Sequence, residues 1–537
     1  MAPPEAEEQH SMLDYDRSDY AKVVKVDNVC DDIENNNTRD KEDTLDVNYD
    51  ALHHSTNRKG VLAQCLAAGA ILLLVTGGGM PIGYSAILLP QLAEENGTMH
   101  ADAELRSWIA AVHSLATPIG SLMGGPLVDT IGRRGALQFS GIPLTLGWFV
   151  IAFANTIPYL LIGRVILGFG VGVMGVGAQI LLGELADPGL RGFLATNTLT
   201  FYCLGILIIY ALGACFTWNI VARCGALLPI AALLALIWIP ESPIWLVKRK
   251  KLEKAKKALL WLRGNNVEQV NAEMLILEAR VKADVVQTSK NTPRLKKMSS
   301  AMSALLKPSV FKPLAIINIF NFLLLIGGTF IIIFYAVELF DDIGGDGVNN
   351  YLAAVILATV RLVFSFIGAT LLLRVNRRAV AIFSALGAAA ASSILTVYML
   401  IKEKSSINIY IACGLLLGYV AASTTGMLTL SGLMVSELLP QKARGIGGGC
   451  NFFIFNILIF VVTKAFSVVN NAIGITGIFA IFAIATLLEA IFVYVAVPET
   501  RNRTLQEIED YFQQDNLFWI TRPREKRKDK PYITHKP

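Results

Sequence analysis

The sequence is short of charge for its length. Asp, Glu, Lys and Arg make up 17% of the 537 residues, whereas 54% are apolar and the mean hydropathy is +0.52. Soluble domains carry about 25% charged residues, so this composition excludes an ordinary soluble protein. The seven cysteines show neither metal-ligand spacing nor a disulfide framework. No catalytic constellation is seen either, so we expect no enzyme, no cofactor, no metal and no nucleic-acid partner.

Long apolar runs account for most of the chain. A bilayer core ~30 Å thick requires ~20 mostly apolar residues per spanning helix. Twelve such runs lie at 61–82, 107–127, 136–154, 158–183, 193–213, 221–239, 313–336, 351–373, 379–400, 408–434, 446–468 and 473–497. The sequence therefore predicts an all-α polytopic membrane protein with twelve transmembrane helices, whose partners are the lipid bilayer and a solute.

Lys and Arg are missing from loops of one parity. The loops at 90–104 and 338–350 contain neither, whereas segment 240–312 holds 16 Lys and Arg against 6 Asp and Glu. Because cytoplasmic loops retain basic residues, both termini are predicted to be cytoplasmic in a plasma-membrane protein. Asn96, in the first outward loop, begins a glycosylation sequon that fits this topology. The sequons at Asn36 and Asn502 fall in the tails.

The polar segments divide the chain into five parts. Residues 1–59 hold 15 acidic and 7 basic residues and no apolar run, which predicts a disordered cytosolic tail. Two six-helix bundles are expected at 60–239 and 313–497, with a cytosolic helical linker at 240–312 and a cytosolic tail at 498–537. The sequence leaves the oligomeric state open.

Charged motifs recur at matching places in the two bundles. GELADPGLRG (183–192) corresponds to SELLPQKARG (436–445), the basic pair 133–134 to 377–378, and PES (240–242) to PET (498–500). The repeat predicts two pseudo-symmetric halves that rock about a central path. We expect Glu184 to meet the arginines of the second half, and Glu437 those of the first, when the cytoplasmic side is shut. The simpler alternative is that these charges only anchor helix ends.

The predicted cytoplasmic gate combines the acids and arginines of both halves. It consists of Asp129, Arg133, Arg134, Arg164, Glu184, Arg191, Glu241, Arg377, Arg378, Glu437, Arg444 and Glu499. The gate motif of the second half is incomplete, because Leu373 stands at the position that corresponds to Asp129 in the first half.

Six motifs in order resemble one family. GGPLVDTIGRR (124–134), GR (163–164), GELADPGLRG, PESPIWL (240–246), SELLPQKARG and PETRNRTLQEIE (498–509) are similar to the signature series of sugar porters in the major facilitator superfamily. Within that family the chain is most like the insect facilitated trehalose transporters, as the stretch KKALLWLRG (256–264) indicates. The resemblance implies movement of a sugar, trehalose or hexose-like, or of a related small neutral solute. It also implies that Arg164 lies near the inner mouth.

The usual sugar ligands of the family are missing. Leu324 and Leu325 stand where the family has two glutamines, and Phe330 where it has asparagine. Since leucine cannot bond a hydroxyl, either the solute is less polar than a hexose or other residues bind it. The candidates are Asn197, Thr198, Tyr202, Asn318, Asn321, Thr329, Thr424, Thr425, Thr429, Ser431, Asn451 and Asn456, and Asn456 is the preferred one.

Ionisable residues inside spans are candidates for function. Glu489 lies in the twelfth span and Arg361 in the eighth, and the resemblance gives neither a role. Glu489 can be a proton-coupling group or a packed carboxyl. Since the first span has no carboxylate, we favour facilitative uniport over proton coupling. The alternative function is a non-transporting sensor on the same scaffold.

Overall fold

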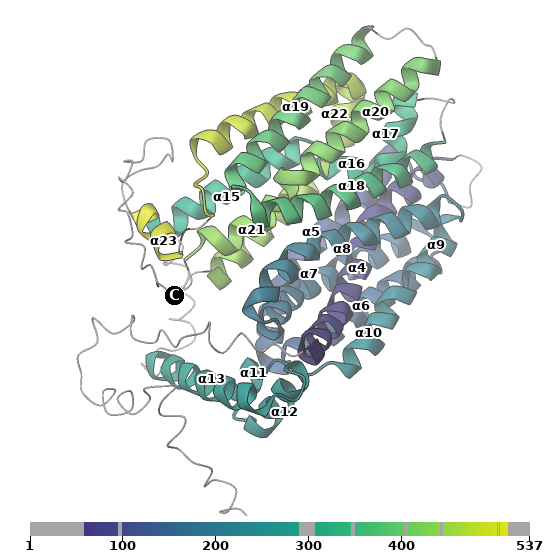
Figure 1. Cartoon of the computed structure of the whole chain (residues 1–537). Coiled ribbons are helices and arrows are strands. Elements are labelled where there is room, and N and C mark those ends of the chain that lie inside the picture. The colour runs from purple at the N-terminus through teal and green to yellow at the C-terminus, as the bar shows by residue number, and fades with distance from the viewer. Residues whose placement is uncertain are drawn as a thin grey trace, which may run out of the picture.

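The computed structural model describes residues 58–94, 99–288, 307–344, 349–401, 406–440, 444–501, 503 and 505–513. These residues are almost entirely helical (Figure 1). Asn96, Asn36 and Asn502 and most of both tails lie outside them. Large apolar side chains such as Trp238 and Phe383 are 82% and 77% exposed on the outer helix faces, as a lipid-facing surface requires.

The first half is built from long apolar helices. They are α4 (Arg58–Ala93), α5 (Ala103–Ile131), α6 (Arg133–Ala152), α7 (Ile157–Leu185), α8 (Pro188–Gly213), α9 (Trp218–Gly225) and α10 (Leu227–Trp238). Helix α5 packs along α7, and α4 along α8. The second contact is close because Gly205 lies against the backbone of Thr76, where a Cβ would come within 2.0 Å of the carbonyl oxygen. Only glycine allows the two helices to approach this closely.

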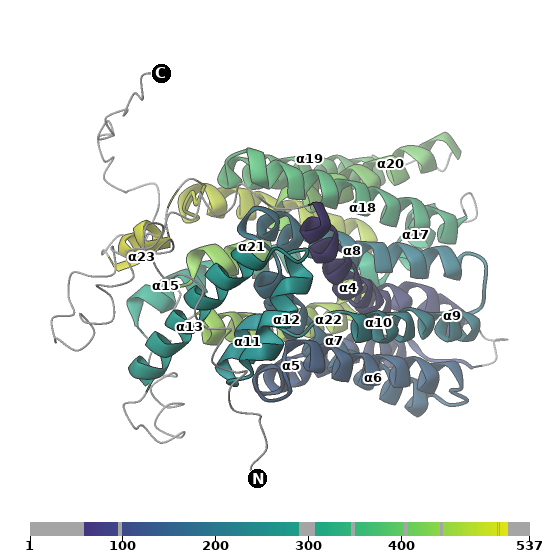
Figure 2. The ribbon, with the colours of Figure 1, turned by 60° about the horizontal axis from the view of Figure 1, so that its bottom comes forward.

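Three helices follow α10 and attach to the first half. They are α11 (Pro243–Lys248), α12 (Leu252–Leu262) and α13 (Val267–Thr288). Arg263 bridges Asp187 at 2.9 Å and Glu273 at 2.8 Å, and Gln64 of α4 donates to Asp187 at 2.7 Å. The linker helices are therefore fixed to one end of the first half, which we call the linker end (Figure 2). The opposite end is the far end.

The second half repeats the architecture with one interrupted helix. It contains α15 (Pro308–Ile326), α16 (Ile331–Phe334), α17 (Ala336–Gly344), α18 (Asn350–Arg374), α19 (Arg377–Ile401), α20 (Ser406–Ser423), the π-helix η3 (Thr424–Leu428), α21 (Thr429–Leu438), α22 (Arg444–Val495) and α23 (Leu505–Gln513). Tyr511 and Phe512 of α23 join the core cluster that contains Leu314 and Ile317 of α15. Helix α23 therefore belongs to the second half.

Helix α22 contains two of the predicted spans. A straight helix of its 52 residues would be ~78 Å long at 1.5 Å per residue, far more than a bilayer. Its backbone breaks at Gly474, where φ is +69°. Lys464 bonds residues of the far end, whereas Val493 accepts from Arg378 at the linker end, so the chain reverses at Gly474. Nine described helices are long and apolar enough to span a membrane, and α5, α8 and the second arm of α22 account for the remaining predicted spans.

The described hydrogen bonds between the halves lie toward the far end. Tyr210 of α8 donates to the carbonyl of Ile333 at 2.5 Å. Lys464 donates to the hydroxyl of Ser107 at 2.7 Å and lies 4.5 Å from the ring centroid of Trp108. Among the described side chains, no ion pair joins the halves at the linker end. The structure is thus held shut at the far end.

Candidate functional site

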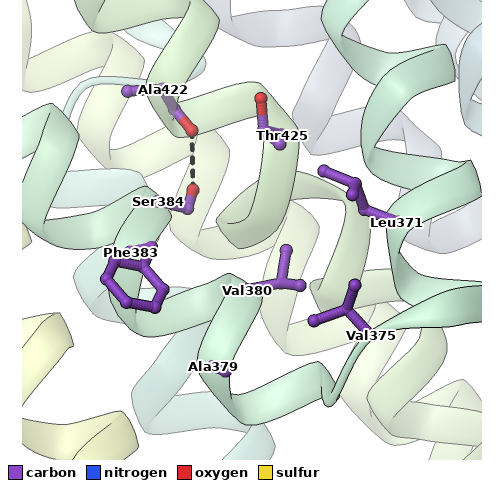
Figure 3. A pocket seen from close by; sticks show the side chains of 8 residues that line it. All are labelled: Leu371, Val375, Ala379, Val380, Phe383, Ser384, Ala422 and Thr425. Atoms are coloured by element: carbon purple, nitrogen blue, oxygen red, sulfur yellow. Dashed lines mark hydrogen bonds between the residues drawn. The ribbon is translucent and has the colours of Figure 1, made fainter.

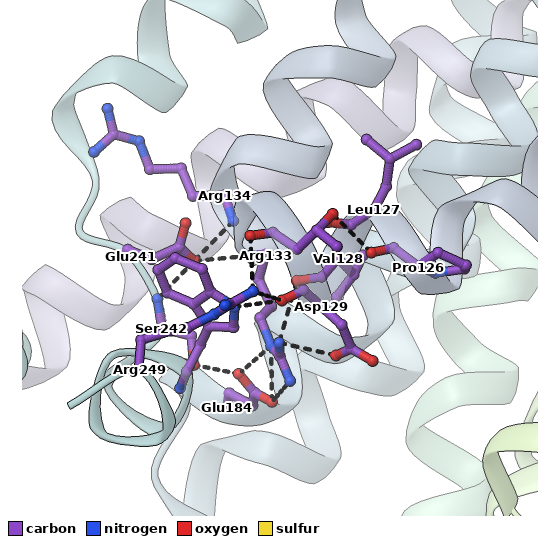
Figure 4. Close-up of polar contacts among 12 residues, drawn as sticks. Pro126, Leu127, Val128, Asp129, Arg133, Arg134, Glu184, Glu241, Ser242 and Arg249 are labelled. Atoms are coloured by element: carbon purple, nitrogen blue, oxygen red, sulfur yellow. Dashed lines mark hydrogen bonds and ion pairs between the residues drawn. The ribbon is translucent and has the colours of Figure 1, made fainter. Parts of the chain in front are cut away.

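Charged residues of the first half form a clamp at the linker end (Figure 4). The Arg133 Nε lies 3.0 Å from the Glu184 carboxylate, which also accepts a hydrogen bond from the Ser242 hydroxyl. The Glu241 carboxylate accepts from the backbone amides of Arg133 and Arg134, both at 2.9 Å. These amides open α6, and a helix N-terminus favours an anion. The clamp joins the α5–α6 loop, the end of α7 and the chain after α10.

The second half contains the same clamp. Arg377 lies 2.7 Å from the Glu437 carboxylate, which accepts from the Thr500 hydroxyl at 2.6 Å. The Glu499 carboxylate accepts from the backbone amides of Arg377 and Arg378 at 3.2 and 3.1 Å, at the start of α19. The repeated sequence motifs therefore form one repeated structure. Its hydroxyl members, Ser242 and Thr500, were not among the predicted site residues, although both follow the repeated Pro-Glu pair.

The second arginine of each pair holds the end of a transmembrane helix. Arg134 donates to the carbonyl of Ile239 at 2.9 Å, just after α10. Arg378 donates to the carbonyls of Val493 and Tyr494 in the last turn of α22. A guanidinium suits this position because the helix C-terminus carries unsatisfied carbonyls and a partial negative charge.

The pairing between halves that is predicted for the shut cytoplasmic side is not present in this structure, where the described ion pairs at the linker end stay within each half, so it remains a prediction. Glu184 and Glu437 each bind an arginine of their own half. The reason is packing: each acid ends a helix that lies beside its own basic loop, while the halves meet toward the other end of the bundle. The side chains of Arg191 and Arg444 lie outside the described set, so their expected contacts stay predictions.

The two clamps differ in one position. Asp129 adds a third charge in the first half, 3.3 Å from Arg133 and 79% exposed. Leu373 occupies the corresponding place in the second half and is 45% exposed. The Nε of Arg377 has no hydrogen-bond partner among the described residues. The second clamp is incomplete, as the sequence predicts.

Arg164 does not belong to the gate. It lies 20 residues before Glu184 in α7, which places it ~30 Å away along the helix, toward the far end. Its guanidinium is fully buried and donates to the carbonyls of Ile109 and Pro81 and to the Ser85 hydroxyl. Arg164 therefore ties α7 to α4 and α5. Because α7 starts at the far end, the structure does not bring Arg164 together with the other predicted gate residues.

Three polar side chains of the second half form a buried cluster. The Asn321 amide nitrogen donates to the Asn451 side-chain oxygen at 3.1 Å, and the Asn321 oxygen accepts from the Ser431 hydroxyl at 2.6 Å. The three residues come from α15, α22 and α21. Of the candidate solute-binding residues, Asn321, Ser431 and Asn451 are the ones that the structure brings together.

Most other candidates bond their own helix. Asn197, Asn318 and Asn456 donate to the carbonyl four residues earlier, and Thr429 donates to that of Thr424. Tyr202 is half-buried on α8. Thr329 is fully buried, and its hydroxyl has no partner among the described residues by hydrogen-bond geometry.

The seventh span is interrupted next to Thr329. Helix α15 ends at Ile326, and Gly328 takes φ +89° before α16 begins. A Cβ on Gly328 would come within 2.2 Å of the Phe482 ring, so only glycine fits this conformation and space. Leu324 and Leu325, one turn earlier, are fully buried. The residues that replace the family's glutamines are therefore packed in the core.

The described pocket on the second half does not lie between the halves. It has a volume of about 320 Å³ and is lined by Leu371, Val375, Ala379, Val380, Phe383, Ser384, Ala422 and Thr425 (Figure 3). All of these residues belong to the second half. Because Phe383 is 77% exposed, the pocket opens on the outer, apolar surface.

An ionisable carboxyl lies at the far end, outside the predicted spans. Burial raises the pKa of Glu338 to about 7, against the opposing effect of Arg106, with Asp342 and Asp341 adding to the rise. A carboxyl whose pKa is raised in the folded state stabilises that state below its unperturbed pKa, and the contribution is lost as the pH rises through about 7.

Comparison with known proteins places these features in a family. Residues 58–512 match the family described as "Sugar (and other) transporter". The chain is 30% identical over 460 residues to a facilitated trehalose transporter of Drosophila grimshawi and 31% identical over 465 residues to one of Polypedilum vanderplanki. Each match covers 85% of the chain, with 48% of the first relative's length and 89% of the second's.

The fold has a counterpart among solved structures. The inward-open xylose transporter XylE from E. coli superposes with a TM-score of 0.65 at 19% identity, over 84% of this chain and 99% of that one. This likeness gives the major facilitator fold, with its two six-helix bundles. The chain belongs to the family described as "Sugar (and other) transporter".

Proposed function

We propose that the protein moves a sugar, trehalose or hexose-like, or a related small solute across the plasma membrane by alternating access. The relatives named as trehalose transporters support this, although the chain spans only about half the length of the first of them. The absence of a carboxylate from α4 supports facilitative uniport.

The observation that carries the proposal is the doubled clamp. Each clamp closes within its own half, so each half can move as one body. Helix α5 packs along α22 and α8 along α18 between the halves, and the described hydrogen bonds that join the halves lie toward the far end. Opening that end therefore requires the loss of contacts such as that of Tyr210 with Ile333, while both clamps remain intact. The gate residues then stabilise the moving bodies instead of locking them together.

We further propose that the linker end faces the cytoplasm, as the basic linker indicates. The structure would then be closed to the outside. Asn96 would be glycosylated on the outer side. The cluster of Asn321, Ser431 and Asn451 would supply hydroxyl-binding groups on the cytoplasmic side of the path.

The test is uptake of labelled trehalose and glucose by proteoliposomes that contain the purified protein. We expect saturable uptake that is the same with and without a proton gradient. Asn321→Ala should weaken sugar uptake, while Thr370→Ala, whose exposed hydroxyl bonds its own helix, should not. Failure to take up either sugar or any related solute would contradict the carrier function and favour a sensor.

A further inference from the structure

Arg361 is a buried cation with most of its hydrogen bonds unmade. It lies in α18, is 1% exposed, and donates through Nη2 to the carbonyl of Thr329 at 3.2 Å. Its Nε and Nη1 have no partner among the described residues. A buried charge is costly unless it is paired and hydrogen-bonded, so this guanidinium lacks a counter-ion.

The second buried arginine shows what a purely structural role looks like. Arg164 is also fully buried, but its donors reach the Ser85 hydroxyl and the carbonyls of Ile109, Ala110 and Pro81. The fold therefore satisfies one internal guanidinium with protein oxygens and leaves the other open. Packing alone does not require an unsatisfied arginine at position 361.

Arg361 lies where the two halves and the broken helix meet. The ionisable side chains close enough to influence it are Cys203 and Tyr210 of the first half and Tyr419 of the second. All three are neutral in their usual protonation state, so none supplies a negative charge. Its one acceptor, the Thr329 carbonyl, belongs to the interruption between α15 and α16. A carrier places its solute at such a broken helix between its halves.

Glu489 is the nearest alternative as an internal counter-ion. It is fully buried in α22, and neither carboxylate oxygen has a partner among the described residues. Tyr419 is influenced by both Arg361 and Glu489, and its hydroxyl donates to the Gly327 carbonyl. However, Glu489 is not among the groups that act on Arg361. Tyr419 is the side chain that lies close to both charged groups.

We propose that Arg361 binds a carboxylate of the transported solute, so that the preferred cargo is an acidic sugar or a similar hydroxylated organic anion. The inference rests on the proposed carrier function and narrows its substrate class. The open guanidinium supplies the donors for the carboxylate oxygens, because arginine forms strong charge-assisted hydrogen bonds with carboxylates. It also accounts for Leu324 and Leu325, since a solute held by its charge depends less on hydroxyl ligands.

The test compares two solutes that differ in one group. Proteoliposomes are supplied with labelled D-glucuronate or labelled D-glucose, which differ by the carboxylate at C6. We expect the wild-type protein to take up glucuronate at least about tenfold faster at low concentration. Arg361→Gln should reduce glucuronate uptake by about 30-fold or more, as loss of a buried charge partner does, and should lower the ratio of glucuronate to glucose uptake by at least about tenfold. Arg361→Lys should retain part of the glucuronate uptake.

Controls separate the possible failures. Glu489→Gln should leave the preference for glucuronate unchanged; if it abolishes uptake as Arg361→Gln does, Glu489 is the counter-ion and the proposal is wrong. Uptake of glucose without preference for glucuronate would overturn the inference and keep the carrier function. Uptake of neither solute, nor of trehalose, would overturn the carrier function itself.

A second measurement applies if Arg361→Gln does not fold. Wild-type protein on a solid-supported membrane should give a current with glucuronate and none with glucose, and the absence of a glucuronate current would refute the proposal.

Discussion

The clamp of the first half should act on stability and not on the contact between halves. We consider Glu184→Gln, which keeps the shape of the side chain and removes its charge. Glu184 accepts from the Nε and Nη2 of Arg133 at 3.0 and 3.2 Å and from the Ser242 hydroxyl. A hydrogen bond to a charged group contributes about 1.5–3 kcal/mol. Arg133 keeps Asp129 and the Val128 carbonyl as partners, so the loss should be limited.

We therefore expect Glu184→Gln to lower the free energy of unfolding by about 2–3 kcal/mol. For a unit of 150–250 residues this corresponds to a fall of about 5–10 °C in apparent melting temperature. Glu437→Gln should cost less, about 1–2 kcal/mol, because its pair with Arg377 is 20% and 19% exposed and water weakens it. Intrinsic tryptophan fluorescence of detergent-purified protein during heating measures both.

Two double-mutant cycles decide between the clamp and a gate. Combining Glu184→Gln with Arg133→Gln should give a coupling energy of about 1 kcal/mol or more, because the residues are in contact. For Glu184→Gln combined with Arg377→Gln, the two changes in the free energy of unfolding should add within about 0.5 kcal/mol. Coupling between Glu184 and Arg377, with additivity inside the first half, would refute the reasoning.

Three further predictions follow from particular contacts. Gly328→Ala should abolish correctly folded protein, because the added Cβ meets an aromatic ring at a positive φ; Gly183→Ala, with open space around it, is the control, and equal yields in size-exclusion chromatography would contradict us. The apparent melting temperature should fall as pH rises from 5 to 8, as the buried carboxyl of Glu338 ionises; an unchanged slope in Glu338→Gln would count against this. Arg263→Gln should release the linker helices to limited proteolysis, because Asp187 loses its bridge; protection equal to wild type would argue otherwise.

The sequence predicts the helices and their charged ends well. A run of ~20 apolar residues has few alternatives in a bilayer, so the described spans fall where hydropathy places them. The repeated motifs also predict that both halves carry the same structure. What a motif does not contain is the identity of its partner. Glu184 and Glu437 lie at the same level of the bundle as arginines of both halves, and only packing selects the arginine of the same half.

Side-chain contacts inside the spans are harder to predict from the sequence. Arg164 lies apart from the other predicted gate residues, which the direction of the fourth span already indicates. The sequence does not predict whether the Arg361 guanidinium is hydrogen-bonded, because its acceptors would come from several helices. Asn321 and Ser431 are both candidates from the sequence, but their mutual hydrogen bond depends on how α15 and α21 pack.

Each half carries a short helix that is fixed to it and therefore moves with it. Helix α12 is fixed to the first half through Arg263 and Asp187, and α23 to the second through Tyr511 and Phe512. Fluorophores on the outer faces of α12 and α23 would therefore move with different halves. Their separation would measure the tilt between the halves in a single molecule, so that each solute could be ranked by the angle it induces before any transport is measured.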